Sequence, residues 1–357
     1  MRRIKNTYLQ TMLYAVLLGG CSGAQKGPRT IGNLEHTVAP EVRSISADEA
    51  RSLAMNHYDA YLQSSPNSAR TPEALKRLAD LNLEKEQSDR VHSDSTQSEK
   101  PSKAAQLYEE LLNRFPDQPN KDQLLYQLAR AHDLTAAAKP SMKALDQLAR
   151  EHAGSDKYDE VQFRRGEFLF IRRQYAEAEI AYRAVIQHSE ASPFYVQALY
   201  KLGWSQFKQH QYKVSLDSFM QLLDRSTTKD FYAPVSNNGL ADAAIERVQD
   251  TLRVASLNFS YLSARYSIRE YFSEMGARVY EPILYESLAA LHISKERFTD
   301  AAQVYHEFSL AHPSHQDAPL FQSRVIDIYK QAGFNNKLIE EKRAYVERYE
   351  PASTYWH

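Results

Sequence analysis

The sequence predicts an all-α protein in which about six helix pairs stack into a solenoid. Small residues recur at a fixed interval of 37 residues, and each is followed four positions later by an aromatic or large apolar residue. Only 11 of the 357 residues are glycine, and residues that favour helices, such as Ala, Leu, Gln and Glu, are abundant. Patterns typical of β-strands are weak throughout, so the repeat period and the composition both predict helices.

Two interleaved series carry this period. The first consists of Ala104/Tyr108, Ser141/Leu145, Ala178/Tyr182 and Ser215/Phe219. The second lies 25 residues after the preceding small residue and consists of Ala129, Gly166 and Gly203. A small residue on each of two helices allows their backbones to approach. A helix pair of this length cannot bury its apolar stripe alone, so neighbouring pairs must stack.

The best copy of the repeat runs from Val196 to Phe207 and continues through Tyr212, Ser215 and Phe219. It resembles the consensus of the tetratricopeptide repeat (TPR), in which helix A crosses helix B of the same pair. The resemblance places Gly203 at the crossing and implies a right-handed superhelix.

The repeat pattern divides the chain into segments. Residues 47–224 form the predicted repeat array, interrupted at 84–100 by a polar stretch that we interpret as a solvated loop or a frayed helix extension. Residues 225–277 are an insertion or degenerate repeats, with an amphipathic helix from Leu240 to Leu262. Residues 278–350 resume the register at Ala301, and residues 351–357 form a tail.

The first twenty residues have the features of a signal peptide. Arg2, Arg3 and Lys5 precede an apolar run that is too short to span a bilayer. The run ends in Leu18-Gly19-Gly20-Cys21, which resembles the lipobox of bacterial lipoproteins and implies cleavage before Cys21 and lipid modification of its thiol. The alternatives are an ordinary signal peptide with an incidental cysteine, or an N-terminal helix.

The same resemblance implies a location. In lipoproteins of Gram-negative bacteria an aspartate after the cysteine favours the inner membrane, and this chain has Ser22. We therefore expect a periplasm-facing body held at the outer membrane by lipid alone, with residues 21–46 as a flexible tether.

Composition and motifs argue against several functions. The 44 basic and 45 acidic residues nearly cancel, so no global field attracts nucleic acid. The 12 histidines lack the spacing of a helical metal site, and no phosphate loop, G-x-S-x-G elbow or dinucleotide-binding pattern is present. We expect no catalytic residues, no metal and no cofactor other than the lipid on Cys21.

In TPR folds helix A lines a concave groove, and this resemblance selects candidate partner-binding residues. They are Tyr126, Arg130, Phe163, Glu167, Phe170, Tyr200, Trp204, Phe207 and Lys208. Such residue types often anchor protein interfaces. The alternative for Trp204 is burial against a neighbouring repeat or the insertion.

The runs around Tyr126, Phe163 and Trp204 resemble large periplasmic TPR proteins linked to TonB-type or gliding machinery. The resemblance to the BamD assembly lipoproteins and to the Tol-Pal coordinator is more distant. All imply a scaffold that binds other cell-envelope proteins through a peptide or helix in the groove. The alternative is an accessory module that binds peptidoglycan or another glycan and presents a cell-wall enzyme.

Overall fold

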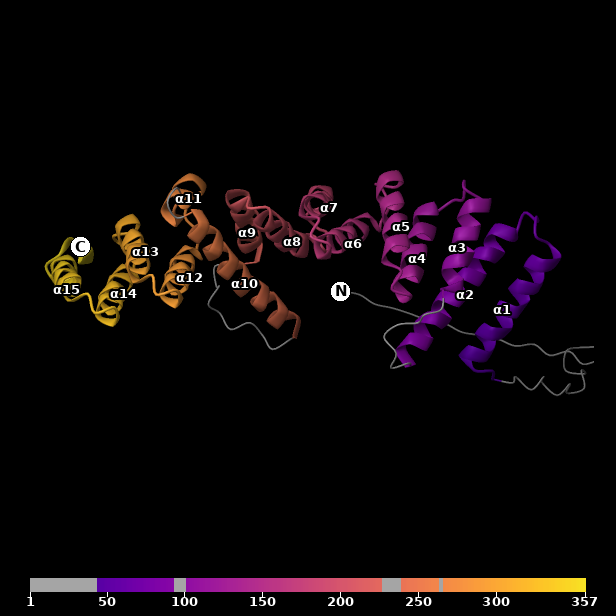
Figure 1. The fold of residues 1–357 in the computed structure, drawn as a ribbon, viewed down its shortest axis with the longest axis horizontal. Helices are drawn as coiled ribbons and strands as arrows, with labels where there is room; N and C mark the ends of the chain where they lie inside the picture. The colour runs from indigo at the N-terminus through magenta and orange to yellow at the C-terminus, as the bar shows by residue number, and fades with distance from the viewer. Residues whose placement is uncertain (1–43, 93–100, 227–238, 263–265) are drawn as a thin grey trace, which may run out of the picture. The chain divides into compact units, whose positions relative to one another are not determined.

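The computed structural model describes residues 44–92, 101–226, 239–262 and 266–357, and these residues form fifteen α-helices (Figure 1). The helices are α1 (Ala47–Ser64), α2 (Thr71–His92), α3 (Lys103–Arg114), α4 (Lys121–Leu134), α5 (Ala138–Glu151), α6 (Tyr158–Ile171), α7 (Tyr175–His188), α8 (Tyr195–Lys208), α9 (Tyr212–Ser226), α10 (Gly239–Leu262), α11 (Ile268–Met275), α12 (Glu281–Ser294), α13 (Phe298–Ala311), α14 (Ala318–Gln331) and α15 (Asn335–Tyr349). A short 3₁₀ helix, η2 (Thr354–Trp356), follows α15. The predicted all-α class is confirmed.

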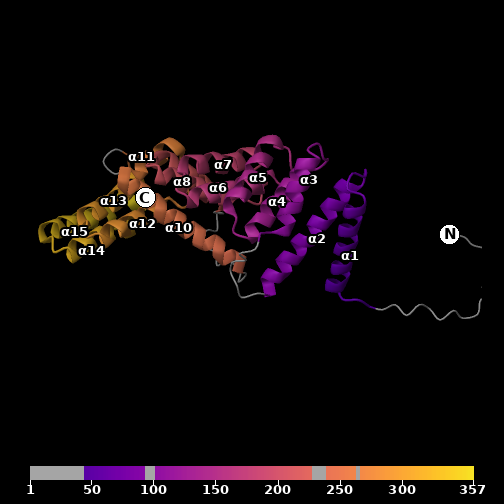
Figure 2. The same ribbon diagram turned by 45° about the vertical axis from the view of Figure 1, so that its right-hand side comes forward.

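The helices pack pairwise in chain order as a TPR-like solenoid. The A–B pairs are α2/α3, α4/α5, α6/α7, α8/α9, α12/α13 and α14/α15, which agrees with the expected six. Each helix B also contacts the helix A that follows it, except where α10 and α11 intervene after α9. Figure 2 shows the same succession of helices from a second direction.

Small residues lie where the paired helices cross. Ala129, Ala178, Ser215 and Ala301 have no exposed surface, and Gly166 and Gly203 are buried. A Cβ atom built on Gly166 would lie 2.4 Å from Cε1 of Tyr182, and one on Gly203 would lie 2.7 Å from Cε1 of Phe219. The tyrosine and phenylalanine rings therefore occupy the space that a larger side chain at either glycine would need.

The A–B turns share a backbone feature that the sequence pattern did not indicate. One residue in each of five turns has a positive φ angle, between 52° and 71°, and these residues are Ala136, Arg173, His210, Glu296 and Gly333. The first three follow the 37-residue period, as do the last two. Only one of the five is glycine, although a left-handed residue with a side chain costs about 1 kcal/mol or more.

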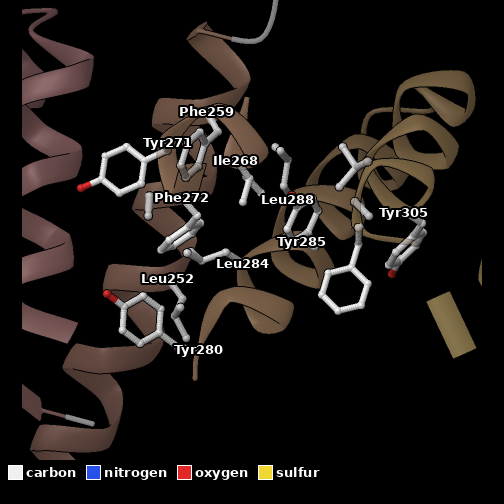
Figure 3. Close-up of a cluster of buried hydrophobic side chains, with 14 of the residues drawn as sticks. Leu252, Phe259, Ile268, Tyr271, Phe272, Tyr280, Leu284, Tyr285, Leu288 and Tyr305 are labelled. Carbon is white, nitrogen blue, oxygen red and sulfur yellow. The ribbon is translucent and has the colours of Figure 1, made fainter. Parts of the chain in front are cut away.

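The segment between α9 and α12 contributes two helices of its own. Helix α10 contacts both α9 and α12, so it connects the α8/α9 pair to the α12/α13 pair. Helix α11 begins with a capping box, in which Ser267 accepts from the Glu270 amide while the Glu270 carboxylate accepts from the Ser267 amide. Side chains of α10, α11 and α12 form one apolar core with α13, shown in Figure 3.

The first part of the polar stretch, for which a loop and a helix extension were the two interpretations, and the C-terminal tail both make ordered contacts. Residues 84–92 continue α2, and Glu86 there accepts hydrogen bonds from the Ser102 hydroxyl at 2.6 Å and from the Lys103 amide at 2.8 Å. In the C-terminal tail, the hydroxyl of Tyr355 donates to the carbonyl oxygen of His315 at 3.1 Å. Residues 93–100 lie outside the described residues.

The chain divides into two units, Met1–Leu53 and Ala54–His357, with the boundary inside α1. The expected signal peptide, Cys21 and most of the 21–46 tether lie outside the described residues. Among the described helices, none combines the length and the apolar character that crossing a membrane requires.

Candidate protein-binding surface

The nine candidate residues lie on α4, α6 and α8, the A helices of three consecutive pairs. Eight of them are half-buried, and Lys208 is exposed. Their polar atoms and rings contact residues of neighbouring helices, so these side chains are held in place by other parts of the protein.

On α4, Tyr126 is tied to the next helix A. Its hydroxyl donates to the carboxylate of Glu160 at 2.6 Å, and the guanidinium carbon of Arg164 lies 5.7 Å from its ring centroid. The pKa of Tyr126 is raised mainly by burial and also by this hydrogen bond. Arg130 lines a cavity of about 340 Å³ between α2 and α4, together with Asp80 and Glu84.

On α6, the carboxylate of Glu167 interacts with one polar and one charged side chain. The Tyr182 hydroxyl of α7 donates to it at 2.5 Å, and Lys201 of α8 forms an ion pair with it at 2.9 Å. Tyr108 of α3 makes an equivalent bond of 2.5 Å to Asp80 of α2. In both pairs a helix-B tyrosine is therefore fixed by the carboxylate that follows the small crossing residue of helix A.

The two candidate phenylalanines of α6, Phe163 and Phe170, pack against other rings. Phe163 lies 5.8 Å from the Tyr182 ring and 5.4 Å from the Phe194 ring. Phe170 contacts Tyr175 edge-on at 5.3 Å, and the Lys201 ammonium lies 5.4 Å from its centroid. Both side chains thus bridge consecutive helices, which leaves only part of each ring to solvent.

Among the candidate residues, those of α8 belong to a group of aromatic side chains around Trp204. We define the aromatic cluster as Tyr200, Trp204 and Phe207 of α8, Tyr212 of α9 and Tyr261 of α10. The rings of Trp204 and Phe207 are 5.6 Å apart, and those of Phe207 and Tyr261 are 6.0 Å apart. Tyr212 and Tyr261 stack at 4.8 Å with an interplanar angle of 12°. These contacts join three helices into one continuous aromatic surface.

Helix α10 of the insertion supplies three contacts of this surface, one of them to Trp204, for which packing against the insertion was the alternative interpretation. The Tyr200 hydroxyl donates to Asp250 at 2.5 Å, and the guanidinium carbon of Arg253 lies 6.0 Å from the Trp204 ring. Burial, supported by the Asp250 bond, raises the pKa of Tyr200 to about 12. Tyr261 is the most accessible member of the cluster because 60% of its surface is exposed. Trp204 itself is half-buried, between the two interpretations considered for it.

The surface combines aromatic rings with cationic side chains, a composition common at protein interfaces. Lys208 places its ammonium 5.5 Å from the Trp204 ring, which adds a cation to the edge of the cluster. Across the ranges that the structure describes, no group of three or more His, Cys, Asp or Glu residues is arranged to hold a metal ion. The arrangement therefore favours recognition of a partner by aromatic and cationic side chains.

The fold defines a class, a TPR-like helical solenoid, and α8, α9 and α10 give it a candidate protein-binding surface. The tetratricopeptide-repeat family model matches residues 197–226, which span α8 and α9. The sequence comparison with curated proteins gives no match.

Several solved TPR structures are similar to this chain. A TPR protein from Parabacteroides merdae is 13% identical, with 78% of this chain and 92% of that one covered and a TM-score of 0.39. The C-terminal part of a TPR protein from Cytophaga hutchinsonii is 10% identical, with 82% of this chain and 95% of that one covered and a TM-score of 0.39. MamA is 14% identical, with 51% of this chain and 95% of MamA covered and a TM-score of 0.36.

Proposed function

We propose that this chain is a lipid-anchored, periplasm-facing scaffold that binds another cell-envelope protein at the aromatic cluster. The observation that supports the partner site is the continuity of half-buried and exposed rings across α8, α9 and α10, with Tyr261 60% exposed. Rigid aromatic side chains supply contact area at a small cost in conformational entropy, and Trp and Tyr anchor interfaces more often than other residues.

The contacts beneath the cluster support this role. Tyr200 is held by Asp250, and Phe207 lies between Trp204 and Tyr212, so the rings are positioned before any partner arrives. Preorganisation lowers the free-energy cost of binding because fewer side chains must be ordered at the interface.

A photo-crosslinking residue placed at Tyr261 is expected to capture one discrete protein in the native envelope. The control position is Ile180 on α7, an apolar residue that is 68% exposed and is not part of the cluster. Adducts would be identified by mass. Equal labelling from positions 261 and 180, or no adduct from 261, would contradict the proposed partner site.

A second candidate function is glycan binding, which the exposed ring of Tyr261, stacked on the half-buried Tyr212, favours as a flat aromatic platform. Isolated peptidoglycan that co-sediments with the native chain but not with Tyr261→Ala would support this alternative over the protein partner. The corresponding control is Val214→Ala on α9, at an apolar position that is 44% exposed.

Replacement of Cys21 with serine is expected to release the chain from the membrane fraction and abolish incorporation of labelled palmitate. The reason is that the proposed anchor is covalent lipid on this single thiol. The matched control is Ser22→Ala, which should leave both signals unchanged. Membrane association of Cys21→Ser at the native level would refute the lipid anchor without affecting the proposed partner site.

A further inference from the structure

A second cavity, separate from the aromatic cluster, lies between α10, α11, α12 and α13. Its volume is about 300 Å³, within the range of pockets that hold small ligands. Phe259, Ile268 and Leu288 line its apolar side, and Figure 3 shows these three side chains close together within the core. The apolar side can therefore contact an alkyl chain.

The polar side carries a carboxylate without a basic partner. Glu307 accepts a hydrogen bond from Nε2 of Gln303 at 3.2 Å, and no described lysine or arginine forms an ion pair with it. Burial raises the pKa of Glu307. The other charged residues of the lining, Arg297 and Asp300, pair with each other at 2.6 Å. Glu307 is thus the carboxylate of this lining for which no described residue forms an ion pair, although the more distant charges of Glu270 and Arg269 on α11 also act on it, the first raising and the second lowering its pKa.

His292 also lines the cavity and is 98% buried, because only 2% of its surface is exposed. Its Nδ1 atom has no hydrogen-bond partner within the described structure. Burial, followed by the nearby charge of Arg297, lowers the pKa of His292 and so favours the neutral ring. The ring therefore adds no positive charge that would repel a cation, and the side chain has unused hydrogen-bonding capacity.

We propose that this cavity binds an alkylguanidinium or alkylammonium group, with the alkyl part against Phe259 and Leu288 and the cation at Glu307. A cation of this kind would pair with a partly desolvated carboxylate, where the interaction is stronger than on an open surface. The source of such a group is either a small organic cation or an arginine or lysine side chain of a protein.

The test is a titration of the full chain with n-butylguanidinium, followed by ligand-observed NMR. The matched neutral probe is n-butylurea, which has nearly the same shape but no charge. We expect saturable binding of n-butylguanidinium that is at least tenfold tighter than that of n-butylurea. Absence of saturable binding, or equal affinity for the two probes, would overturn the proposal.

Two variants locate the binding in the cavity. Glu307→Gln keeps the shape of the side chain and should weaken n-butylguanidinium binding at least tenfold, whereas Glu340→Gln, at an exposed position on α15, should leave it unchanged. Equal binding by both variants would exclude this cavity. A capped Gly-Gly-Arg-Gly-Gly peptide that competes with n-butylguanidinium would identify a protein side chain as the ligand. Binding of the small cation alone would identify a free molecule.

Discussion

Replacement of Gly166 with leucine is expected to lower the free energy of unfolding by at least about 3 kcal/mol. Even the first added atom would lie 2.4 Å from Cε1 of Tyr182, a ring with no exposed surface. The ring cannot move away easily because its hydroxyl is bonded to Glu167, so α6 and α7 must separate. Chemical denaturation followed by far-UV circular dichroism would measure the loss.

An ordered series of alanine variants separates this clash from a general effect of removing glycine. Gly166→Ala should destabilise more than Gly203→Ala, where the closest atom is 2.7 Å away, and Gly154→Ala should change stability by less than about 0.5 kcal/mol because nothing lies within 4 Å. An equal loss in all three variants, or none in Gly166→Ala, would show that these rings yield and that close packing at the crossing is not required.

The sequence predicted the regular part of the fold because the crossing geometry constrains residue size. Where helix A meets helix B, only a small residue leaves room for the ring that packs there, so the 37-residue period is visible at Gly166, Gly203 and Ser215. The six pairs and the helix from about residue 240 to residue 262 follow from this period and from amphipathic spacing.

The turns between paired helices show no comparable pattern in the sequence. Their left-handed positions are occupied by Ala136, Arg173, His210, Glu296 and Gly333, which share no side-chain property. The constraint there acts on the backbone, and the packed helices on either side enforce it regardless of the side chain.

The candidate site likewise contains residues that the repeat register predicts and contacts that it does not predict. The register of α8 indicated Tyr200, Trp204 and Phe207, but no sequence pattern indicated that Asp250 and Tyr261 of α10 would meet them. Residues 50 positions apart, such as Tyr200 and Asp250, are brought together only by the packing of the insertion against α8 and α9. The carboxylate that anchors Tyr182 was similarly selected as a groove residue rather than as a structural partner.

Replacement of Phe308 with alanine is expected to cost about 3–5 kcal/mol, the usual range for a buried phenylalanine. The side chain is 1% exposed, stacks on Phe321 of α14 at 4.0 Å and contacts Tyr285 of α12 edge-on at 5.3 Å. It therefore joins three successive helices. Phe334→Ala is the control, since that ring is 38% exposed and should cost less than about 1 kcal/mol.

The loss in Phe308→Ala should also be local. In a solenoid each repeat contacts only its neighbours, so stability is close to a sum of repeat and interface contributions. Hydrogen exchange is expected to accelerate over α12–α15 and to stay unchanged over α4–α6, whose apolar side chains belong to other apolar clusters. Uniform acceleration along the whole chain would instead mean that the repeats unfold as one cooperative unit, and that the helices of the insertion, α10 and α11, transmit stability between the two groups of pairs.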